Sequence, residues 1–286
     1  MTKNWYPGHM AKTKRLISEK YDLIDIVYEL IDARIPVSSK ISNIDSILKN
    51  KPRLLIMTKS DLCDLEVTCE YVKHYEDKGY KVILANLNDS NIVRTIIDET
   101  NELMSSLQEK RTNKGLKEKE IRALVIGIPN VGKSTLINKL ANRKVANVGN
   151  KPGITKNITW LKTNSNILLL DTPGILAPKI DSDMVFLNLA SMGTIKKEIL
   201  SPDEVAIHIL KILNTYYPHI LKERYKIDSV NIDDILLTYE AIGKNKGLLT
   251  KGGEVDETRV SELIINDIKQ EYIKGITFDR RESQDD

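Results

Sequence analysis

The stretch GIPNVGKS, residues 127–134, decides the fold. It matches the pattern G-x-x-x-x-G-K-[ST] between the apolar run ALVIGI (123–128) and the helical pattern STLINKLAN (134–142), which is the strand-then-helix setting that this motif requires. Its glycines let backbone N–H groups turn inward around phosphate oxygens, and the helix N-terminus adds partial positive charge. We therefore predict a phosphate-binding loop (P-loop) in which Lys133 reaches the β- and γ-phosphates and Ser134 holds Mg²⁺. Further nucleotide contacts are expected from Asn130, Val131, Gly132 and Thr135.

Two further motifs follow the P-loop along the chain. Asp171 begins DTPG (171–174) directly at the end of the apolar run ILLLD. An acidic residue at a strand end that faces a P-loop completes the Mg²⁺ shell, usually through water. We expect Gly174 to donate its N–H to the γ-phosphate. Thr155, in PGIT (152–155), is expected to be the second hydroxyl on Mg²⁺ when a triphosphate is bound.

The identity of the base is predicted from TKSD (58–61), which follows the apolar run RLLIM (53–57). A guanine reader needs a carboxylate that accepts from the ring N1–H and the 2-amino group together, and adenine offers no such pair. Asp61 supplies this carboxylate, and Lys59 is expected to lie along the ring and to steady the P-loop. Thr58 stands where Asn is usual; its hydroxyl retains one polar contact, so we expect slightly weaker binding with specificity kept.

The motifs occur in rotated order, with the base reader before the P-loop and DTPG after it. A circular permutation that joins the old chain ends produces this order, and the polar segment 109–120 is the expected joint. A second base-contacting loop is expected after KVILAN (81–86), at Asn86.

Strands alternate with helical patterns in residues 1–180, which predicts an α/β domain with a mostly parallel sheet covered on both faces. Residues 181–286 show helical spacing without a clear strand, which predicts an all-helical C-terminal domain.

The composition of the chain indicates which kinds of partner and cellular compartment are expected. The net charge is +3, but residues 1–180 hold 29 Lys and Arg against 20 Asp and Glu, whereas residues 181–286 hold 14 against 20. The basic front half indicates a phosphate-bearing partner, and the acidic second half restricts RNA binding to patches. No apolar run approaches the ~20 residues of a membrane span, and two cysteines give no disulfide framework, which fits a reducing cytosol. We expect a cytoplasmic protein that does not associate with membranes.

Three basic groups are candidates for RNA contacts, because Lys and Arg bind phosphate and flanking Tyr side chains can stack on bases. Charged helix faces are often simply solvated, so both interpretations stay open. The groups are Lys12, Lys14 and Arg15; Lys222, Arg224 and Lys226; and Lys244, Lys246 and Lys251.

Other polar residues carry less information. His74, His208 and His219 occur singly in helical patterns, and we interpret them as structural or surface residues. Asp32-Ala33-Arg34 follows a strand and is either structural or a contact to a partner. The polar end RRESQDD (280–286) is expected to be disordered.

Taken together, these motifs resemble the circularly permuted GTPases and, within them, the bacterial ribosome-biogenesis GTPase A (YlqF-like) family. The resemblance covers nearly the whole chain and includes WYPGHMAK (5–12), DIVYELIDARIP (25–36), TYYPHILKERY (215–225) and AIGKNKGLLTKGG (241–253) besides the motifs above. It implies a GTPase that binds GTP, GDP and Mg²⁺ and acts as an assembly factor on the large ribosomal subunit or its precursor, with contacts to rRNA. GTP would favour docking and hydrolysis would cause release. The free protein is expected to be a monomer.

One catalytic group is missing from its usual place. Many GTPases place a Gln directly after the Gly of DxxG to orient the attacking water, but this position is Ile175, so hydrolysis should be slow in the free protein. The family is thought to use the His of its N-terminal PGHM segment, which corresponds to His9. Trp5 and Tyr6 could anchor this segment by burying their rings, and imidazole can orient water or accept its proton. The alternative is that the segment only packs and His9 lies on the surface.

Asn130 has a second expected role, because similar GTPases with Asn at this position use K⁺ as an extra positive charge near the phosphates. Two rival functions stay open. One is a GTPase that serves tRNA modification or another RNA process, and the other is a binding switch in which hydrolysis hardly matters. Asp61 disfavours an ATPase.

Overall fold

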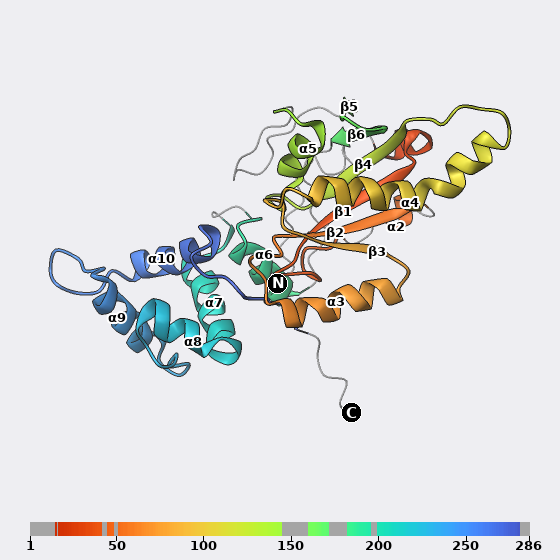
Figure 1. The fold of residues 1–286 in the computed structure, drawn as a ribbon. Coiled ribbons are helices and arrows are strands. Elements are labelled where there is room, and N and C mark those ends of the chain that lie inside the picture. The colour runs from red at the N-terminus through yellow and green to blue at the C-terminus, as the bar shows by residue number, and fades with distance from the viewer. Residues whose placement is uncertain are drawn as a thin grey trace.

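A six-stranded sheet in the order β3-β2-β1-β4-β6-β5 forms the centre of the molecule, a computed structural model (Figure 1). The described residues are 15, 17–41, 45–48, 51–144, 160–171, 182–195 and 199–280. The strands are β1 (Ile26–Asp32), β2 (Arg53–Thr58), β3 (Lys81–Ala85), β4 (Ile121–Gly127), β5 (Trp160–Lys162) and β6 (Ile167–Asp171).

The sheet is mostly parallel, as predicted. β1 pairs in parallel with β2 on one side and with β4 on the other, β2 continues to β3, and β4 continues to β6. β5 pairs with β6 in the antiparallel sense at the edge. β4 is fourth along the chain yet lies beside β1 in the middle of the sheet. The predicted α/β class with a permuted order of motifs is therefore confirmed.

Helices cover both faces of the sheet. Tyr28 of β1 points to one face, where its hydroxyl lies 2.7 Å from Thr100 Oγ1 of α4. Met57 of β2 lies in a second apolar cluster, which includes Tyr71 of α3. All seven positions of β1 are buried, as is typical of a central parallel strand. Five of them are apolar, and the two buried carboxylates, Glu29 and Asp32, are paired with basic side chains. The helices around the sheet are α2 (Asp45–Leu48), α3 (Leu65–Asp77), α4 (Ile92–Thr112) and α5 (Lys133–Ala141), together with a short 3₁₀ turn, η1 (Tyr21–Leu23).

The joint between the two halves of the sheet is shorter than predicted. We expected a linker over 109–120, but α4 continues to Thr112, so the first residues of that segment are helical. The side chain of Gln108 then holds the returning chain: its Nε2 donates to Lys119 O at 2.9 Å, and Lys119 N donates to its Oε1 at 3.2 Å. The chain thereby comes back along α4 before β4 begins.

Helices form the rest of the described chain and lie beside one end of the sheet (Figure 1). Pro202 starts α7 as predicted, with the Ser201 hydroxyl accepting from Asp203 N at 3.2 Å. The described residues of this part contain no strand, only an isolated bridge between Leu249 and Val255. No described helix is both long enough and apolar enough to cross a membrane. The helices are α6 (Asp183–Ser191), α7 (Pro202–Tyr216), α8 (Pro218–Ile220), a π-helical turn η3 (Leu221–Tyr225), α9 (Ile235–Lys246) and α10 (Glu257–Lys269).

After α10 the chain returns to the sheet. Phe278 N donates to Arg34 O at 2.7 Å, beyond the end of β1. The buried carboxylate of Asp279 accepts the N–H of Ser38 at 2.8 Å and the amide of Asn188, on α6, at 2.9 Å. One connected apolar core therefore runs from the sheet through the helices to Phe278.

Arg280 lies in the end that was expected to be disordered, and this expectation was wrong for that residue. Its Nη2 donates to Tyr217 OH at 2.6 Å, and its guanidinium lies 4.0 Å from the ring centroid of Tyr216. These two tyrosines end α7, so Arg280 fastens the returning segment to the helices. Residues 281–286 lie outside the described part of the chain.

Candidate nucleotide-binding site

The predicted binding loops gather at the carboxyl ends of the parallel strands, because these ends lie on the same side of the sheet. The P-loop follows β4, TKSD overlaps the end of β2, Asn86 follows β3, and Asp171 ends β6. In α/β sheets, ligands bind in the crevice outside the carboxyl ends of the strands, where the loops from neighbouring strands diverge. The sheet therefore assembles the motifs that the rotated chain order separates.

The P-loop backbone has the shape that phosphate binding requires. Asn130 and Gly132 have φ values of 62° and 103°, and α5 begins directly after them. A Cβ on Gly127 would lie 2.8 Å from Leu30 O of β1, so glycine is needed for the close approach of the two strands. Lys133 is buried at the first turn of α5. The helix N-terminus and this ammonium group place positive charge where the loop N–H groups converge.

Thr58 lies beneath the P-loop. It is fully buried, and its Oγ1 lies 2.6 Å from Val131 O and 3.1 Å from Ile31 O. One hydroxyl proton can satisfy one of these two carbonyls at a time, and the shorter contact is the one to the P-loop. In this structure the Thr58 hydroxyl therefore supports Val131 from below.

Lys59 is held by a buried ion-pair network. Its Nζ lies 3.1 Å from Asp32 Oδ2, and Arg34 donates to the same carboxylate through Nε at 3.0 Å and Nη2 at 2.8 Å. Burial disfavours the charged form of Asp32, but Arg34 and Lys59 outweigh it and hold the pKa of this carboxyl well below its usual range. The structural interpretation of Asp32-Ala33-Arg34 is thus favoured, since this triplet positions Lys59 beside the P-loop.

The two loops that are predicted to contact the base are neighbours. Ser60 N donates to Ala85 O at 3.3 Å, which ties TKSD to the end of β3. Asp61 is exposed at the tip of its loop, as a group that receives a ligand must be. The side chain of Asn86 instead closes its own turn, with Oδ1 accepting from Asn88 N at 2.8 Å. The geometry therefore gives Asp61 a direct path to a ligand and gives Asn86 a role in shaping its loop.

Several predicted residues fall outside the described part of the chain. These are His9, Thr155 and Gly174; for Asp171 only the backbone is described, at the end of β6 beside β4. Among the described residues, no cluster of three or more His, Cys, Asp or Glu forms a metal site. At the predicted magnesium site, Ser134 lies in the first turn of α5, and its hydroxyl oxygen is of the donor type that Mg²⁺ prefers.

A cavity of about 590 Å³ opens beside the P-loop. One part of its lining comes from the predicted binding loops, and the other part comes from the turn after α6 and the end of α10. Sequence reasoning missed the second part, because no local pattern marks those residues as ligand-facing. The lining residues are Arg34, Lys59, Asn130, Gly132 and Thr135, and then Met192, Gly193, Lys269, Gln270 and Glu271.

Asn130 joins the two parts of this lining. Its Nδ2 donates to Gly193 O at 2.6 Å, across 63 residues of chain. The amide oxygen of the same side chain is a carbonyl oxygen, the type of donor that coordinates K⁺ in proteins. The P-loop is thereby bonded to the turn that follows α6.

This arrangement defines the class of protein: a circularly permuted P-loop GTPase. The family model of the 50S ribosome-binding GTPase matches residues 122–240. A Ribosome biogenesis GTPase A of Bacillus pumilus is 44 % identical over 283 residues, which is 99 % of this chain and 100 % of that protein. The chain belongs to the ribosome biogenesis GTPase A family, and it is a GTP-binding GTP hydrolase.

More distant relatives share the architecture. A mitochondrial ribosome-associated GTPase 1 of Mus musculus is 36 % identical over 222 residues, covering 74 % of this chain and 67 % of that protein. The crystal structure of GNP-bound YlqF from T. maritima superposes with a TM-score of 0.64 at 24 % identity, covering 94 % of this chain and 98 % of that one. Because the sequence identity to this structure is only 24 %, the similarity shows that the two proteins share a fold and shows nothing further.

Proposed function

We propose that this protein is an assembly factor for the large ribosomal subunit, which docks on the ribosomal particle with GTP bound and leaves after hydrolysis. The observation that carries the proposal is the similarity along 99 % of the chain to a protein named as a ribosome biogenesis GTPase. The contact between Asn130 and Gly193 supports it, because a docking domain must respond to the nucleotide and here it touches the P-loop directly. We expect this work to take place in the cytoplasm.

We assign the nucleotide roles to the following groups. Lys133 and the P-loop N–H groups bind the phosphates, and Asp61 accepts from the guanine base. Ser134, Thr155 and Asp171 hold Mg²⁺, which neutralises charge on the phosphates. Thr58 and Lys59 support these groups through the contacts with Val131 and Asp32 described above.

Water attack on the γ-phosphate needs a polar group that the chain lacks after Gly174, where Ile175 stands. We assign this role to His9, whose imidazole can orient the water or accept its proton. Docking on the ribosomal particle would bring His9 into place, so hydrolysis is slow in the free protein and rises on the particle. Asn130 would hold K⁺ beside the phosphates and add positive charge where it develops in the reaction.

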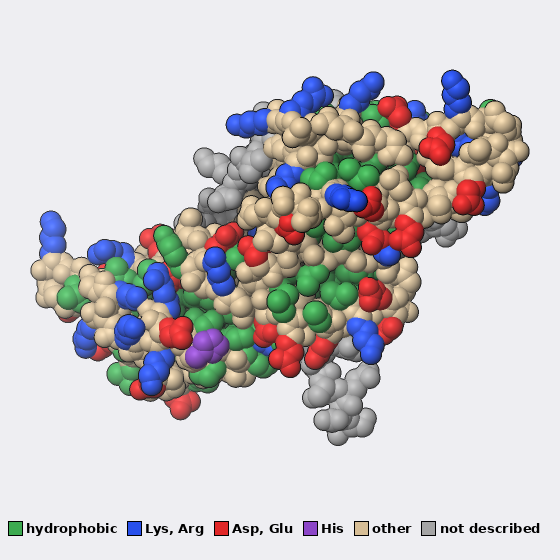
Figure 2. Space-filling model, viewed as in Figure 1, with side chains coloured by type: hydrophobic (Ala, Val, Ile, Leu, Met, Phe, Trp, Pro, Cys, Tyr) green, Lys and Arg blue, Asp and Glu red, His purple; other side chains and the backbone are tan. Residues whose placement is uncertain are grey.

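Residues 1–180 would form the GTPase domain and residues 181–286 the ribosome-contacting domain. Lys and Arg side chains gather over the end of the molecule that carries α8 and α9 (Figure 2). Partial burial lowers the pKa of Lys246, and the neighbouring Arg224 and Lys226 act in the same direction while Asp267 opposes them. Like charges held together in this way favour a polyanion such as rRNA.

Of the three basic groups, the first cannot be compared, because Lys12 and Lys14 lie outside the described part of the chain, and the other two do not support RNA binding equally. Arg224 donates to the buried carboxylate of Asp267 at 2.9 Å, so its role is structural. Lys226 and Lys251 are exposed, whereas Lys244 pairs with Glu240 at 2.9 Å. Lys226, Lys246 and Lys251 are therefore the residues we assign to rRNA phosphates.

The deciding experiment measures GTP hydrolysis in K⁺ buffer with and without purified large ribosomal subunits, and with small subunits as the control. The proposal expects strong stimulation by the large subunit alone. It also expects co-sedimentation with that subunit when a non-hydrolysable GTP analogue is bound and little with GDP. A rate of GTP hydrolysis that neither subunit changes, or that tRNA raises instead, would contradict the ribosomal assignment. It would not contradict the GTPase activity.

A further inference from the structure

A large cavity lies at the opposite end of the sheet from the nucleotide site. It is bordered by the residues that precede β1 and β2, by the last turns of α4 and by the chain that follows α4. The amino ends of the parallel strands lie there, so one length of β1, about 20 Å, separates this cavity from the P-loop. In Figure 1 the end of α4 also lies far from α8 and α9. The cavity therefore belongs neither to the nucleotide site nor to the helical part.

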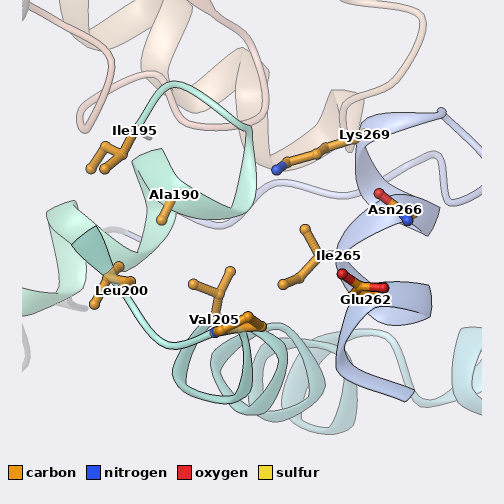
Figure 3. Close-up of a pocket in the computed structure, with 9 residues that line it drawn as sticks. Ala190, Ile195, Leu200, Val205, Glu262, Ile265, Asn266 and Lys269 are labelled. Carbon is orange, nitrogen blue, oxygen red and sulfur yellow. The ribbon is translucent and has the colours of Figure 1, made fainter. Parts of the chain in front are cut away.

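The size of this cavity allows it to hold a ligand. Its volume of about 490 Å³ is within the range of about 300–1,000 Å³ that is usual for ligand sites. A recess between α6, α7 and α10 is much smaller, at about 50 Å³, and apolar side chains such as Val205 and Ile265 lie around it (Figure 3). That recess is too small for a nucleotide, whereas the cavity at the amino ends of the strands can accommodate one.

The segment that joins the two halves of the permuted sheet forms one wall of this cavity. Gly115, with a φ of 71°, turns the chain after α4. Leu116 N then donates to Arg111 O at 3.0 Å, and Arg111 Nε donates to Lys117 O at 3.2 Å. Together with the contacts of Gln108 described above, these hydrogen bonds hold the returning chain beside the last turn of α4.

The charged residues of the joining segment are sorted by sign. Residues 109–120 contain five Lys or Arg and three Glu. Four of the basic residues line the cavity, and the three Glu are not among its described lining residues. The basic lining residues are Lys110, Arg111, Lys114 and Lys119, and the three acidic ones are Glu109, Glu118 and Glu120. The wall that the joint supplies is therefore positively charged.

Lys51, just before β2, adds a fifth cation to the lining. Its Nζ donates to Ile24 O at 2.7 Å and lies 4.3 Å from the ring centroid of Tyr21. Both of these partners are neutral, so they hold the ammonium group in place without cancelling its charge. The position of this charge is fixed, because Ile24 itself lines the cavity.

Little negative charge opposes these cations. Asp25 is the single carboxylate among the described lining residues, and it is already paired with Lys119. Within the part of the chain that the structure describes, Lys110 and Lys114 form no ion pair, and both are exposed. Exposed side chains change rotamer within nanoseconds, so these two charges can reach an anion at the opening from any resting position.

The floor of the cavity is apolar. Leu103 and Leu107 lie one turn apart on α4, and both are half-buried. Leu116, which is 50 % exposed, faces solvent on the joining segment. Apolar surface of this kind can contact a base or a ribose, while phosphate groups bind to Lys and Arg.

We propose that this cavity binds a segment of RNA, with its phosphates at the basic wall and a base or ribose against the leucines. The inference rests on the proposed ribosomal function, because rRNA is the polyanion of the ribosomal particle. It gives the GTPase domain an RNA contact of its own, far from Lys226, Lys246 and Lys251. The chain then spans two RNA sites, with the nucleotide site between them. Two such contacts bind more tightly than either one, because the second forms within the same complex.

The test compares wild type, the double variant Lys110→Gln/Lys114→Gln and the control Lys73→Gln/Lys78→Gln, all as the full chain. The control removes the same charge from exposed positions on α3 and at its end, which do not line the cavity. One measurement is the Kd for labelled rRNA that has been extracted from large subunits and freed of protein. The other is the Kd for intact large subunits with a non-hydrolysable GTP analogue bound. Both are measured at several KCl concentrations.

We expect the double variant to bind the free rRNA and the large subunit at least about fivefold more weakly than wild type. The slope of log K against log salt should become shallower by about 1.4, the value for two phosphate contacts on a single strand. The control should stay within about twofold of wild type. GTP hydrolysis by the free protein should be the same in all three proteins, because the cavity lies at the other end of the sheet.

Each outcome decides the question. Weaker binding of the double variant to both partners, with the shallower slope and an unchanged melting temperature, supports the RNA site. Binding like wild type overturns it, and so does an equal loss in the control, because net charge would then explain the effect. A loss on the large subunit but not on free rRNA also overturns it, because the partner would then be an acidic protein. Wild type that binds free rRNA but not the large subunit would instead contradict the proposed ribosomal function.

Discussion

The carboxylate of Asp279 accepts a hydrogen bond from the backbone N–H of Ser38 at 2.8 Å, which joins positions 241 residues apart. The same oxygen accepts the N–H of Val37 at 2.7 Å, and the other oxygen accepts from Asn188 on α6. Both backbone groups follow β1, where Asp32 and Arg34 organise the nucleotide site. The final described segment therefore connects the helices to the loop that supports Lys59.

Removing this carboxylate should weaken the connection between the helices and the segment after β1, and so destabilise the protein. Asp279→Ala removes the acceptor of two N–H groups and of the Ser38 hydroxyl, and leaves the Asn188 amide with Ser38 Oγ alone. Each unsatisfied buried group costs about 1–3 kcal/mol. We expect the free energy of unfolding to fall by about 3 kcal/mol in total, measured by urea denaturation. Asp233→Ala, on an exposed loop, is the control and should change it by less than about 0.5 kcal/mol. Equal stability of the two variants would refute this role.

Stability should fall below neutral pH through His208. Burial, with a smaller effect of Lys211, lowers the pKa of His208 from 6.5 to about 4. The folded state thus favours the neutral imidazole, whose Nε2 lies 2.7 Å from Asn188 Oδ1. This contribution is fully present above pH 6.5 and is lost as the pH falls toward 4.

We therefore expect wild type to lose about 2 kcal/mol more than His208→Gln between pH 7 and pH 5. Gln can still donate to the Asn188 oxygen but does not titrate. Urea denaturation at both pH values measures the difference. Parallel losses in the two proteins would show that His208 is not the titrating group.

The preference for guanine over xanthine should depend on the Asp61 carboxylate. Guanine offers two donors to this carboxylate, whereas xanthine replaces the 2-amino group with a carbonyl that accepts. Asp61→Asn presents a donor there, so we expect GDP affinity to fall by at least about 100-fold and xanthosine diphosphate to bind more tightly than GDP. Competition titrations with labelled nucleotide measure both effects. An unchanged preference for GDP would remove Asp61 from the base site.

His9 should matter only for the stimulated reaction. His9→Ala should lower hydrolysis on the large subunit by at least about 100-fold, the range of general acid–base catalysis, and leave the Kd for GDP unchanged. Single-turnover hydrolysis with saturating subunits measures the chemical step. His9→Gln, which can still orient water, should retain more activity than His9→Ala. Normal stimulated turnover in His9→Ala would favour the packing role of the WYPGHM segment.

The response to K⁺ should depend on Asn130. Replacing K⁺ with Na⁺ should slow GTP turnover in wild type, because the larger ion is the one expected beside the phosphates. Asn130→Ala should be slow in both salts and insensitive to the exchange. This variant also loses the bond to Gly193, so the comparison of the two salts within each protein is the informative readout, and equal K⁺ sensitivity in both proteins would be evidence against the role.

The site was predictable where its chemistry is local. GIPNVGKS and TKSD place glycines, two lysines and a carboxylate at strand ends. The turn of the loop requires the glycines, and phosphate and guanine require the charged groups. The sequence predicted that the Thr58 hydroxyl keeps one polar contact, and only the structure shows that its nearest partner is Val131 O. Asp32 and Arg34 were left undecided, since their role depends on Lys59, which lies in the turn after the neighbouring strand β2.

By itself, the sequence determined the alternation of strands and helices in the front part of the chain, the helical character of the second part, the permuted order and the loops expected to bind phosphate. Each of these follows from apolar periodicity or from a short motif whose residues interact with their chain neighbours or with one ligand. Only the tertiary structure decided that the segment after α10 returns to β1 through Asp279, and that the end of α10 lines the P-loop cavity. These placements depend on burial and hydrogen bonds between groups far apart in the chain, and such pairings leave no periodic pattern in either segment.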